Sequence, residues 1–522
     1  DATAWGISGF EGELQDFSPD YWNAIAERNR DMVADVDAFD DGTDDNDDEE
    51  DFDDVDRVTA DVLRDRVCLD LALHHQGETL ASLNNIDSPV QTIRDTFLIM
   101  PRETDDDVEN LRERLSRVPD ALHGYCESLA EAASQGHVAA ARQVEEVVSQ
   151  CEDLADEDSV LQHLGLDEND PVVVEAQEAF AHVAGWLAEQ LAPHAPHEDA
   201  VGRDRYEMFS HLHVGEFVDL DEAYQWSLEQ LRDIDAQQLQ VAQQLYGPGT
   251  TIREAMKKLN ADERYLIRGT DALQEWMQKT ADQAIADLDG VSFNIPEQAR
   301  QVECLIDPAG TGGIFYTQPS DDFSRPGRMW WSVPKTQEVF HTWQELTTVF
   351  HEGVPGHHLQ ISQTLVEKDL NLWRRVACWN SGHGEGWALY AESLMKELGY
   401  HEDPGNLMGY LDAQRLRAAR VAIDIGIHLN KRNPECTGLW DASYARSFLR
   451  ENTSMNEDAL YFELNRYLGW PGQAASYAIG QRLWLNLRDE AISQGQTLAQ
   501  FHSKALSYGS IPMGILRDQV LN

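Results

Sequence analysis

Positive charge is scarce in this sequence of 522 residues. Lys and Arg together number 40 against 94 Asp and Glu, which gives a formal net charge of −54, and no lysine occurs before Lys257. The phosphates of nucleic acids and of anionic lipids would repel such a chain. The composition therefore excludes a general affinity for DNA, RNA or anionic membranes, and we expect no nucleic-acid partner.

Paired cysteines and long apolar runs are missing as well. The six cysteines are scattered without a C-x-x-C pair, which argues against a zinc ribbon and against a disulfide-rich secreted scaffold. No apolar run approaches the ~20 residues of a membrane span. No signal peptide is visible, although the sequence begins at Asp1 without a methionine, so a leader removed before that residue would not be seen. We expect a cytoplasmic protein.

Acidic residues are spread through every hundred residues of the chain. Their mutual repulsion would burden a compact fold in dilute buffer, whereas molar salt shortens the Debye length to about 3 Å and screens it. We interpret the charge as the adaptation of a halophile to a salty cytoplasm. The densest acidic stretch, residues 35–56, lacks the glycine and glutamate spacing of an EF-hand and is predicted to be a solvated loop.

Hydrophobic periodicity predicts a mainly α fold with a small β-sheet. From about residue 58 to 298, apolar residues recur at spacings of three and four, which is typical of amphipathic helices. Residues 291–334 are instead rich in Gly, Pro, β-branched and aromatic residues, and they predict short strands and turns before helical patterns return. We divide the chain into a helical amino-terminal region, 1–290, and a catalytic region, 291–522.

The residues that indicate a chemistry lie in the segment 342–360, which reads T-W-Q-E-L-T-T-V-F-H-E-G-V-P-G-H-H-L-Q. Thr342 and Glu345 have the spacing of a capping box, so a helix is predicted to start there. His351 and Glu352 are similar to the opening of the H-E-x-x-H helix of zinc peptidases. In that helix two histidines bind the metal and the glutamate acts on water.

The second histidine of this motif comes late. The fourth residue after His351 is Pro355, and the next histidines are His357 and His358. An ideal helix would turn His357 about 120° away from His351 and place His358 about 10 Å along the axis, so neither fits. Pro355 cannot donate an N–H, and Gly356 tolerates unusual torsions. We therefore predict a bulge that returns His357 to the ligand position, with His358 close behind the ligands.

A third ligand is expected from a nearby helix. Residues 381–392, S-G-H-G-E-G-W-A-L-Y-A-E, place Glu385 at a helix start and Glu392 seven residues later on the same face. An exposed, arginine-paired helix is the simpler alternative, but Trp387 and its apolar neighbours favour burial, where unpaired carboxylates are costly. Catalytic zinc commonly takes two histidines, one carboxylate and water. We assign Glu385 as the third ligand and Glu392 to orienting a ligand histidine.

These segments together resemble a known family, catalogued as domain of unknown function 885 and grouped with gluzincin-type metallopeptidase-like proteins. The resemblance covers about 300–515 and rests on H-E-G-V-P-G-H-H-L-Q at 351–360, G-E-G-W-A-L-Y-A-E at 384–392, R-x-A-R-V-A-I-D-I-G-I-H at 417–428, R-Y-L-G-W-P-G-Q-A-A-S-Y-A-I-G at 466–480 and, more weakly, residues 319–327. It implies a mostly helical, zincin-like metallopeptidase architecture with a small β-sheet next to the active-site helix. It also implies His351, His357 and Glu385 as metal ligands.

A peptidase also needs a group that stabilises the developing oxyanion. Tyr477 is the first choice and His428 the second. Asp424 lies four residues before His428 on one helical face, so it would set the tautomer of that histidine. A structural polar network inside a helix bundle is an equal alternative for the pair.

Three further residues are predicted to contact the substrate. Arg325 and Arg466 have the planar fork that grips a carboxylate through two hydrogen bonds, so they are candidates to clamp a peptide terminus. Tyr316 belongs to a Gly-rich segment that is predicted to be a strand and to pair with an extended substrate.

We expect a zinc-dependent metallopeptidase that hydrolyses short peptides through a metal-activated water, with Glu352 as general base. Two alternatives stay open. One is hydrolysis of a non-peptide amide or ester, and the other is a catalytically inactive metal-binding scaffold, which the retained Glu352 disfavours. The expected partners are one divalent metal, above all Zn²⁺, and a peptide or small amide substrate.

Overall fold

The computed structural model describes residues 2–5, 7–40, 53–167, 169–307, 313–334 and 336–521. The described chain is mainly helical with two small sheets, which confirms the predicted fold class at that level. It forms two compact units, Asp1–Val201 with Tyr461–Trp470, and Gly202–Leu460 with Pro471–Asn522. The division falls near residue 201 and not near residue 290, because the helices between these points pack with the second unit.

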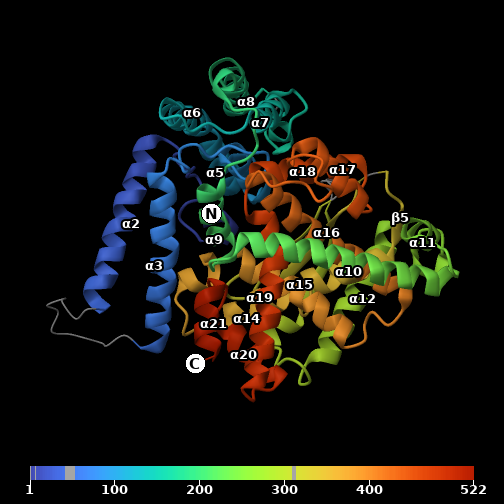
Figure 1. Ribbon diagram of the computed structural model, residues 1–522. Helices are drawn as coiled ribbons and strands as arrows, with labels where there is room; N and C mark the ends of the chain where they lie inside the picture. Colours follow the sequence, from blue (N-terminus) through green and yellow to red (C-terminus); the bar gives the residue numbers. More distant parts are fainter. Residues whose placement is uncertain are drawn as a thin grey trace. The chain divides into compact units, whose positions relative to one another are not determined.

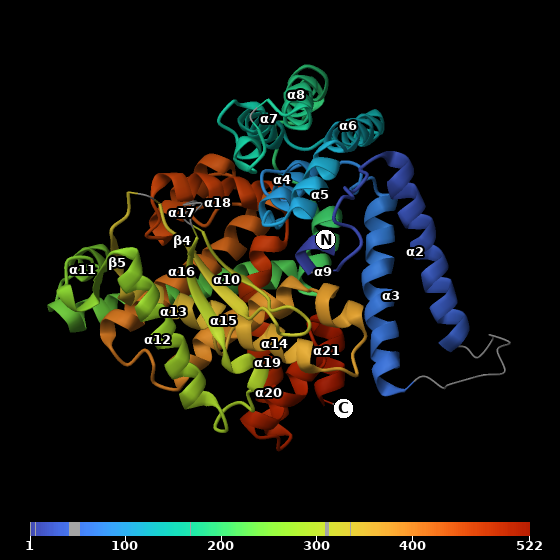
Figure 2. The same ribbon diagram turned by 180° about the vertical axis from the view of Figure 1, so that it is seen from behind.

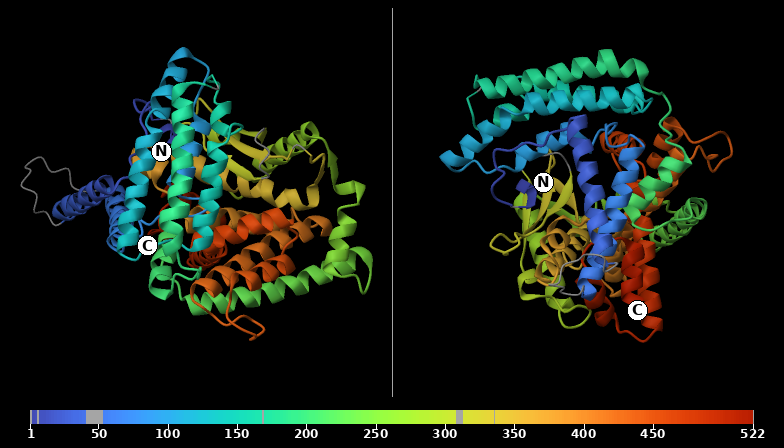
Figure 3. Two further views of the ribbon diagram at one scale, coloured as in Figure 1. Left: turned by 90° about the horizontal axis from the view of Figure 1, so that it is seen from above. Right: turned by 90° about the vertical axis from the view of Figure 1, so that its left-hand side faces the viewer.

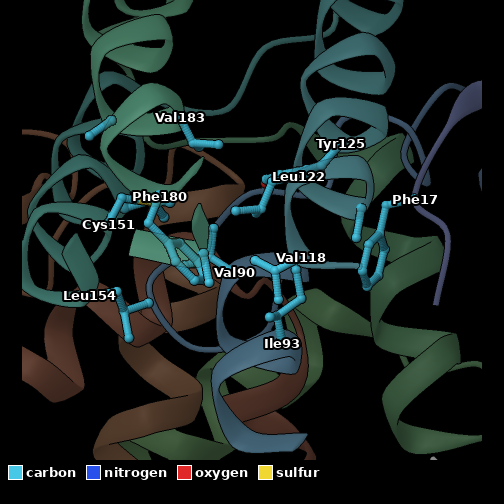
Figure 4. Close-up of a cluster of buried hydrophobic side chains, with 14 of the residues drawn as sticks. Phe17, Val90, Ile93, Val118, Leu122, Tyr125, Cys151, Leu154, Phe180 and Val183 are labelled. Atoms are coloured by element: carbon cyan, nitrogen blue, oxygen red, sulfur yellow. The ribbon is translucent and has the colours of Figure 1, made fainter. Parts of the chain in front are cut away.

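The first unit is built from helices around one apolar core. Its elements are α1 (Ala2–Trp5), α2 (Pro19–Asp40), α3 (Asp54–His75), α4 (Pro89–Ile99), α5 (Asp105–Leu115), α6 (Val118–Ser134), α7 (Ala141–Ala155), α8 (Pro171–Trp186) and the short turns η1 (Val160–His163), η2 (Leu187–Leu191) and η3 (Ala192–His194). Pro89 and Pro171 start their helices, because the missing N–H costs nothing in the first turn. Helices α6, α7 and α8 lie side by side (Figure 3). Ile93, Cys151 and Phe180 belong to the same cluster of buried side chains (Figure 4).

The predicted acidic loop 35–56 is wrong at both ends. Helix α2 continues to Asp40 and α3 begins at Asp54, while residues 41–52 lie outside the described part of the chain. Asp53 caps α3 by accepting hydrogen bonds from two backbone N–H groups of its first turn. Negative side chains suit a helix start because its N–H groups and dipole attract them, so part of the acidic run serves as a cap.

The second unit holds the remaining helices. They are α9 (Arg203–Val214), α10 (Leu220–Tyr246), α11 (Ile252–Leu259), η4 (Glu263–Tyr265), α12 (Thr270–Leu288), η5 (Glu297–Arg300), α13 (Thr342–Glu352), α14 (His357–Val366), η6 (Trp373–Ala377), α15 (Ser381–Glu397), α16 (Pro404–His428), α17 (Ala442–Asn452), the first residues of α18 (Glu457–Gly469), α19 (Gln473–Ser493), α20 (Leu498–Ser507) and α21 (Met513–Leu521). Helix α16 packs along α10, and α15 packs along α19 (Figure 1). Helix α16 also packs against α13 (Figure 2). Within the described ranges, no helix has both the length and the apolar character that crossing a bilayer requires.

Glycines allow α15 and α19 to approach closely. A Cβ added to Gly480 would lie 2.2 Å from the carbonyl oxygen of Gly382. A Cβ added to Gly386 would lie 2.5 Å from the carbonyl carbon of Gly480. Both distances are far below van der Waals contact, and close-packed interiors leave no room to relax them. The glycines therefore hold the first turns of α15 directly against α19.

Two small sheets complete the second unit. The strands are β1 (Leu266–Arg268), β2 (Val302–Asp307), β3 (Ile314–Thr317), β4 (Gly327–Ser332) and β5 (Val339–His341). In the three-stranded sheet the order is β2-β4-β3, with β4 parallel to β2 and antiparallel to β3, and β1 pairs antiparallel with β5. Strands β2 to β4 fall in the segment predicted to form strands, and β4 contacts α14 (Figure 2). The small sheet thus lies beside the helix that follows the H-E motif.

Candidate metal centre

The helix that carries the motif is interrupted, not bulged. Helix α13 ends at Glu352 and α14 begins at His357, so the predicted bulge in one continuous helix is wrong. The N–H of Gly356 donates to the carbonyl of Phe350 at 3.0 Å, and a Cβ on Gly356 would lie 1.9 Å from the carbonyl oxygen of His351. Only glycine permits this approach. The chain therefore folds back on the end of α13 and brings His357 next to His351.

Two imidazoles and one carboxylate converge at this break. Nε2 of His351 lies 3.6 Å and Nε2 of His357 lies 3.5 Å from Oε2 of Glu385. One ligand atom from each of the three side chains lies within 4.8 Å of the others, and the two imidazole planes are perpendicular with centroids 4.9 Å apart. The N···O distances exceed the ~2.7–3.2 Å of a good hydrogen bond but match the edge, about 3.4 Å, of a tetrahedron with metal–ligand bonds of ~2.1 Å. The three side chains therefore form a group that could hold a divalent cation.

The two histidines are held in different ways. Oε1 of Glu392 lies 2.8 Å from Nδ1 of His351, and the hydroxyl of Thr347 donates to Oε2 of Glu392 at 2.6 Å. This pairing leaves Nε2 of His351 facing the other ligand atoms, which is the orienting geometry expected of Glu392. Nδ1 of His357 is buried without a hydrogen-bond partner in the described residues, and its ring centroid lies 6.1 Å from that of Trp379.

The carboxyls of the centre have pKa values driven in opposite directions. Burial disfavours charge on Glu385, but its contacts with His351 and His357 hold its pKa well below the usual range. Burial raises the pKa of Glu352, and the positive histidines only partly offset this. Burial would lower the pKa of His351, yet its contacts with Glu385 and Glu392 raise it to about 9. An ionised Glu385 suits a ligand, whereas a readily protonated Glu352 suits a proton acceptor.

His358 anchors Tyr316 and does not hydrogen-bond to a ligand histidine. Its Nε2 lies 3.0 Å from the carbonyl oxygen of Ala299, and its Nδ1 lies 2.8 Å from the hydroxyl of Tyr316. Burial lowers the pKa of His358 to about 4, so the neutral ring donates to Ala299 and accepts from Tyr316. Gly327 makes room for the pair, since a Cβ there would lie 2.0 Å from the hydroxyl oxygen. The contact fixes the phenol of β3 beside α14.

The two predicted carboxylate clamps differ in their surroundings. The guanidinium of Arg325 has no hydrogen bond or ion pair in the described part of the chain, and its charge partly offsets the burial that raises the pKa of Tyr316. Arg466 belongs to the first unit and pairs with Glu463 at 3.2 Å in its own helix. A half-buried, unpaired cation near Tyr316 suits substrate binding. The role of Arg466 stays a prediction.

Asp424 and His428 lie in a buried polar network. Asp424 accepts hydrogen bonds from the hydroxyl of Tyr206 at 2.8 Å and from the N–H of Gly472 at 3.0 Å. Its other oxygen lies 3.5 Å from Nε2 of His428, whose ring stacks on Tyr206. These contacts correspond to the structural alternative for the pair, and a catalytic role of His428 stays a prediction.

Tyr477 lies close to the start of the helix that carries Glu385. The hydroxyl oxygen of Ser476, the residue before Tyr477, lies 2.8 Å from the hydroxyl oxygen of Ser381 in the first turn of α15. The guanidinium of Arg420 lies 4.8 Å from the ring centroid of Tyr477. The phenol of Tyr477 is half-buried, and the contact described for its ring is with Arg420 of α16.

The predicted capping box at Thr342 is wrong, although the helix starts there. The N-cap is His341, the last residue of β5, and no side chain in the described part of the protein caps the helix. Glu345 instead accepts a hydrogen bond from the indole N–H of Trp331 at 3.3 Å, and burial raises its pKa to about 7. Strand β5 leads directly into helix α13, and the carboxyl of Glu345 contacts Trp331 of β4 instead of the helix start.

Two residues near the centre were not found from the sequence. Trp379 packs against His357, and the charge of Arg417 contributes, after burial and His351, to the pKa of Glu392. Arg417 opens the R-x-A-R segment, which was a usable signal. No sequence signal pointed to Trp379, because a single tryptophan before a Gly-rich turn shows neither helical periodicity nor the spacing of metal ligands.

Solved structures share this fold. A "putative lipoprotein" from Colwellia psychrerythraea has a TM-score of 0.80 at 22% identity, with 99% of this chain and 94% of that chain covered. A "putative lipoprotein of unknown function" from Shewanella oneidensis has a TM-score of 0.74 at 16% identity, with 100% and 96% covered. At these identities the likeness shows the fold alone. No curated protein matches the chain.

One family of sequences matches almost the whole chain. The match extends over residues 1–520, well beyond the segments on which the resemblance rests. The family description names no activity, so the chemistry has to be argued from the residues of the centre. The chain belongs to the family described as "Bacterial protein of unknown function (DUF885)".

Proposed function

We propose that the protein is a metal-dependent hydrolase of the zincin type that cleaves short peptides, with zinc as the favoured metal. The observation that carries the proposal is the position of Oε2 of Glu385, which lies close to a tetrahedral edge distance from Nε2 of both His351 and His357. The three side chains could hold a divalent cation, and a fourth position would take water. The helix ending in the H-E pair, beside a small sheet, supports the zincin-like architecture. Glu352 supplies the base that such a site requires.

Each residue of the centre has a separate role in the proposed reaction. A zinc ion bound by the three side chains would supply Lewis acidity and lower the pKa of a water molecule at the open position. Glu352 takes a proton from the attacking water, since burial makes it ready to hold one, and returns it to the leaving amine. Glu392 keeps the ring of His351 in its tautomer and orientation throughout.

Substrate contacts are proposed for residues around the centre. Tyr477 is favoured over His428 as donor to the oxyanion, because Tyr477 is half-buried and directly follows Ser476, which contacts Ser381 of α15, whereas His428 is fully buried in its network. Arg325 would bind a substrate carboxylate, because its guanidinium has no acidic partner in the described part of a chain with 94 acidic residues. Tyr316, which His358 anchors, would line the same side of the site.

Two other functions use the same residues. A non-peptide amide or ester would be attacked by the same water and base, and only a substrate screen separates it from a peptide. A metal-binding scaffold without activity would not need Glu352. The presence of that buried carboxyl next to His351, at a cost in desolvation, therefore favours the hydrolase.

The proposal is tested by measuring the metal content of the protein and then by replacing Glu352, the proposed base. We expect about one equivalent of zinc in the purified protein, and hydrolysis of some members of a short-peptide library in molar KCl. Glu352→Gln should keep the metal and the fold but lower kcat by about 10²–10⁴-fold, the share usual for a general base. Glu345→Gln is the matched control, because it makes the same change in the same helix and should alter kcat by less than about threefold.

The outcomes separate the alternatives. Full activity of the Glu352→Gln protein would show that this residue is not the base. Hydrolysis of esters or non-peptide amides alone would replace the peptide by another bond with the same chemistry. Stoichiometric metal without hydrolysis of any substrate would leave the scaffold as the better description.

A further inference from the structure

We propose that Trp379 forms a subsite for an aromatic or large aliphatic side chain of the substrate, next to the bond that is cleaved. The inference rests on the proposed function and names the class of substrate that the centre accepts. Trp379 lies between the π-helical turn η6 and the first turn of α15, the helix that carries Glu385.

The indole is wedged between the segments that carry two of the proposed ligands. Its centroid lies 6.1 Å from that of the His357 ring, and the two planes are inclined by 52°. The indole also lies against Gly384, where an added Cβ would be 2.1 Å from Cη2 and 2.4 Å from Cζ2 of the ring. Since Gly384 directly precedes Glu385, the absence of a side chain at this position is what lets the ring reach the centre.

Part of the indole is nevertheless open to solvent. Trp379 is 45% exposed, whereas Trp343, Trp387 and Trp484 are at most 1% exposed. All fourteen tryptophans lie in the described residues, and Trp379 is the only one among the exposed large hydrophobic side chains. A large apolar surface is costly to leave in water. The contact with Gly384 involves only one edge of the ring, so packing there does not account for the exposed remainder. The exposed part of the ring is therefore available to a ligand, and the ring itself lies next to that of His357.

The chemistry around Trp379 selects among side chains that can stack on an indole. A divalent ion held by His357 would repel a cationic side chain at this distance, although the face of a tryptophan alone attracts cations. Glu385, which directly follows Gly384 beneath the ring, would repel an acidic one. A neutral aromatic or large aliphatic side chain meets neither charge and gains both burial and ring contact.

Binding without turnover tests this subsite. The Glu352→Gln protein, loaded with zinc in molar KCl, is titrated by calorimetry with the pentapeptides Ala-Ala-Phe-Ala-Ala, Ala-Ala-Lys-Ala-Ala and Ala-Ala-Ala-Ala-Ala. We expect the phenylalanine peptide to bind about tenfold more tightly than the all-alanine peptide. Adding Trp379→Ala should reduce this ratio to within about twofold, while Trp379→Phe should retain most of it. Zinc content should be unchanged in both variants.

A purely structural role would weaken all three peptides alike and leave the ratio unchanged, and that result would overturn the proposal. Equal binding of the phenylalanine and alanine peptides, tighter binding of the lysine peptide, or no binding of any of them would overturn it as well. If Trp379→Ala does not fold, Trp379→Gln keeps a planar side chain over Gly384 without an apolar face, and it should lose the preference in the same way. Absence of hydrolysis by the unaltered protein contradicts the proposed function alone, because the titration requires no turnover.

Discussion

Glu392 decides how one proposed ligand is presented. It is fully buried, and it accepts hydrogen bonds from Nδ1 of His351 and from the hydroxyl of Thr347. Burial disfavours its charge, but the contact with His351 and the charge of Arg417 hold its pKa below the usual value. A buried carboxylate that stays ionised both fixes the tautomer of the histidine and increases the basicity of its other nitrogen.

Replacing this carboxylate by an amide should weaken metal binding. In Glu392→Gln one hydrogen bond to His351 can remain, but the negative charge is lost. We expect the affinity for zinc, measured by competition with a chromogenic chelator, to fall by about 10–100-fold.

Glu397→Gln is the control in the same helix, since Glu397 is exposed and pairs with Arg488 away from the ligands. Its zinc affinity should not change. An unaltered affinity in Glu392→Gln would mean that the hydrogen bond to His351 has no influence on the metal.

The helices of the centre are placed by backbone contacts that only glycine allows. At the break between α13 and α14, Gly356 lies against the carbonyl of His351, and between α15 and α19 Gly480 lies against the carbonyl of Gly382. Backbone atoms cannot turn aside as a flexible side chain does. The relative placement of the ligand-bearing helices therefore depends on small residues that carry no chemistry themselves.

A methyl group at the contact between α15 and α19 should be destabilising. In Gly480→Ala the new Cβ would lie 2.2 Å from a backbone oxygen, so the two helices must separate. We expect the free energy of unfolding, measured with denaturant, to fall by about 1–3 kcal/mol, the usual cost of overpacking. Zinc affinity should fall too, because Glu385 lies on α15.

The matched control is a helical glycine of the same unit that has room. In Gly514→Ala, on α21, the nearest atom to the new Cβ would be 3.5 Å away, an ordinary contact. Stability there should stay the same or rise by up to about 1 kcal/mol, since alanine favours the helix. A smaller loss for Gly480→Ala than for Gly514→Ala would contradict the packing argument.

The molecule as a whole carries far more negative than positive charge. Many of its arginines form ion pairs, such as Arg482 with Glu222 and Arg450 with Glu457. The acidic residues still outnumber the basic ones, with a formal net charge of −54. Exposed pairs of this kind contribute little to stability. Repulsion among the remaining carboxylates opposes the compact state and is screened by salt. The halophilic origin and the salty cytoplasm inferred from this charge stay predictions.

Stability should therefore rise with ionic strength. We expect the midpoint of thermal unfolding to increase steadily between 0.1 and 2 M KCl, because shorter screening lengths weaken the repulsion. Sucrose at the same osmolarity is the control, since it stabilises proteins by exclusion without screening charge. A midpoint that falls with KCl, or that sucrose raises equally, would show that charge repulsion is not a main burden on this fold.

Much of the fold and part of the centre could be predicted, because these features depend on local patterns. Helical periodicity and the β-branched segment gave the mainly helical chain with its small sheet. The H-E pair and the later Glu385 named side chains that the structure brings together. Local patterns failed where packing intervened, as at Glu345, which binds the indole of Trp331 instead of capping its helix. They also placed a loop over residues that form the end of α2 and the start of α3.

The sequence by itself determined the charge of the protein, its helical character and the identity of the three candidate ligands, since each follows from residue types and short spacings. Only the tertiary structure decided that Gly356 folds the chain back on α13, that Glu392 reaches Nδ1 of His351 and that Trp379 lies across Gly384. The physical reason is distance along the chain. Contacts between segments many residues apart depend on the packing of whole helices, and no spacing within one helix or strand records how two of them meet.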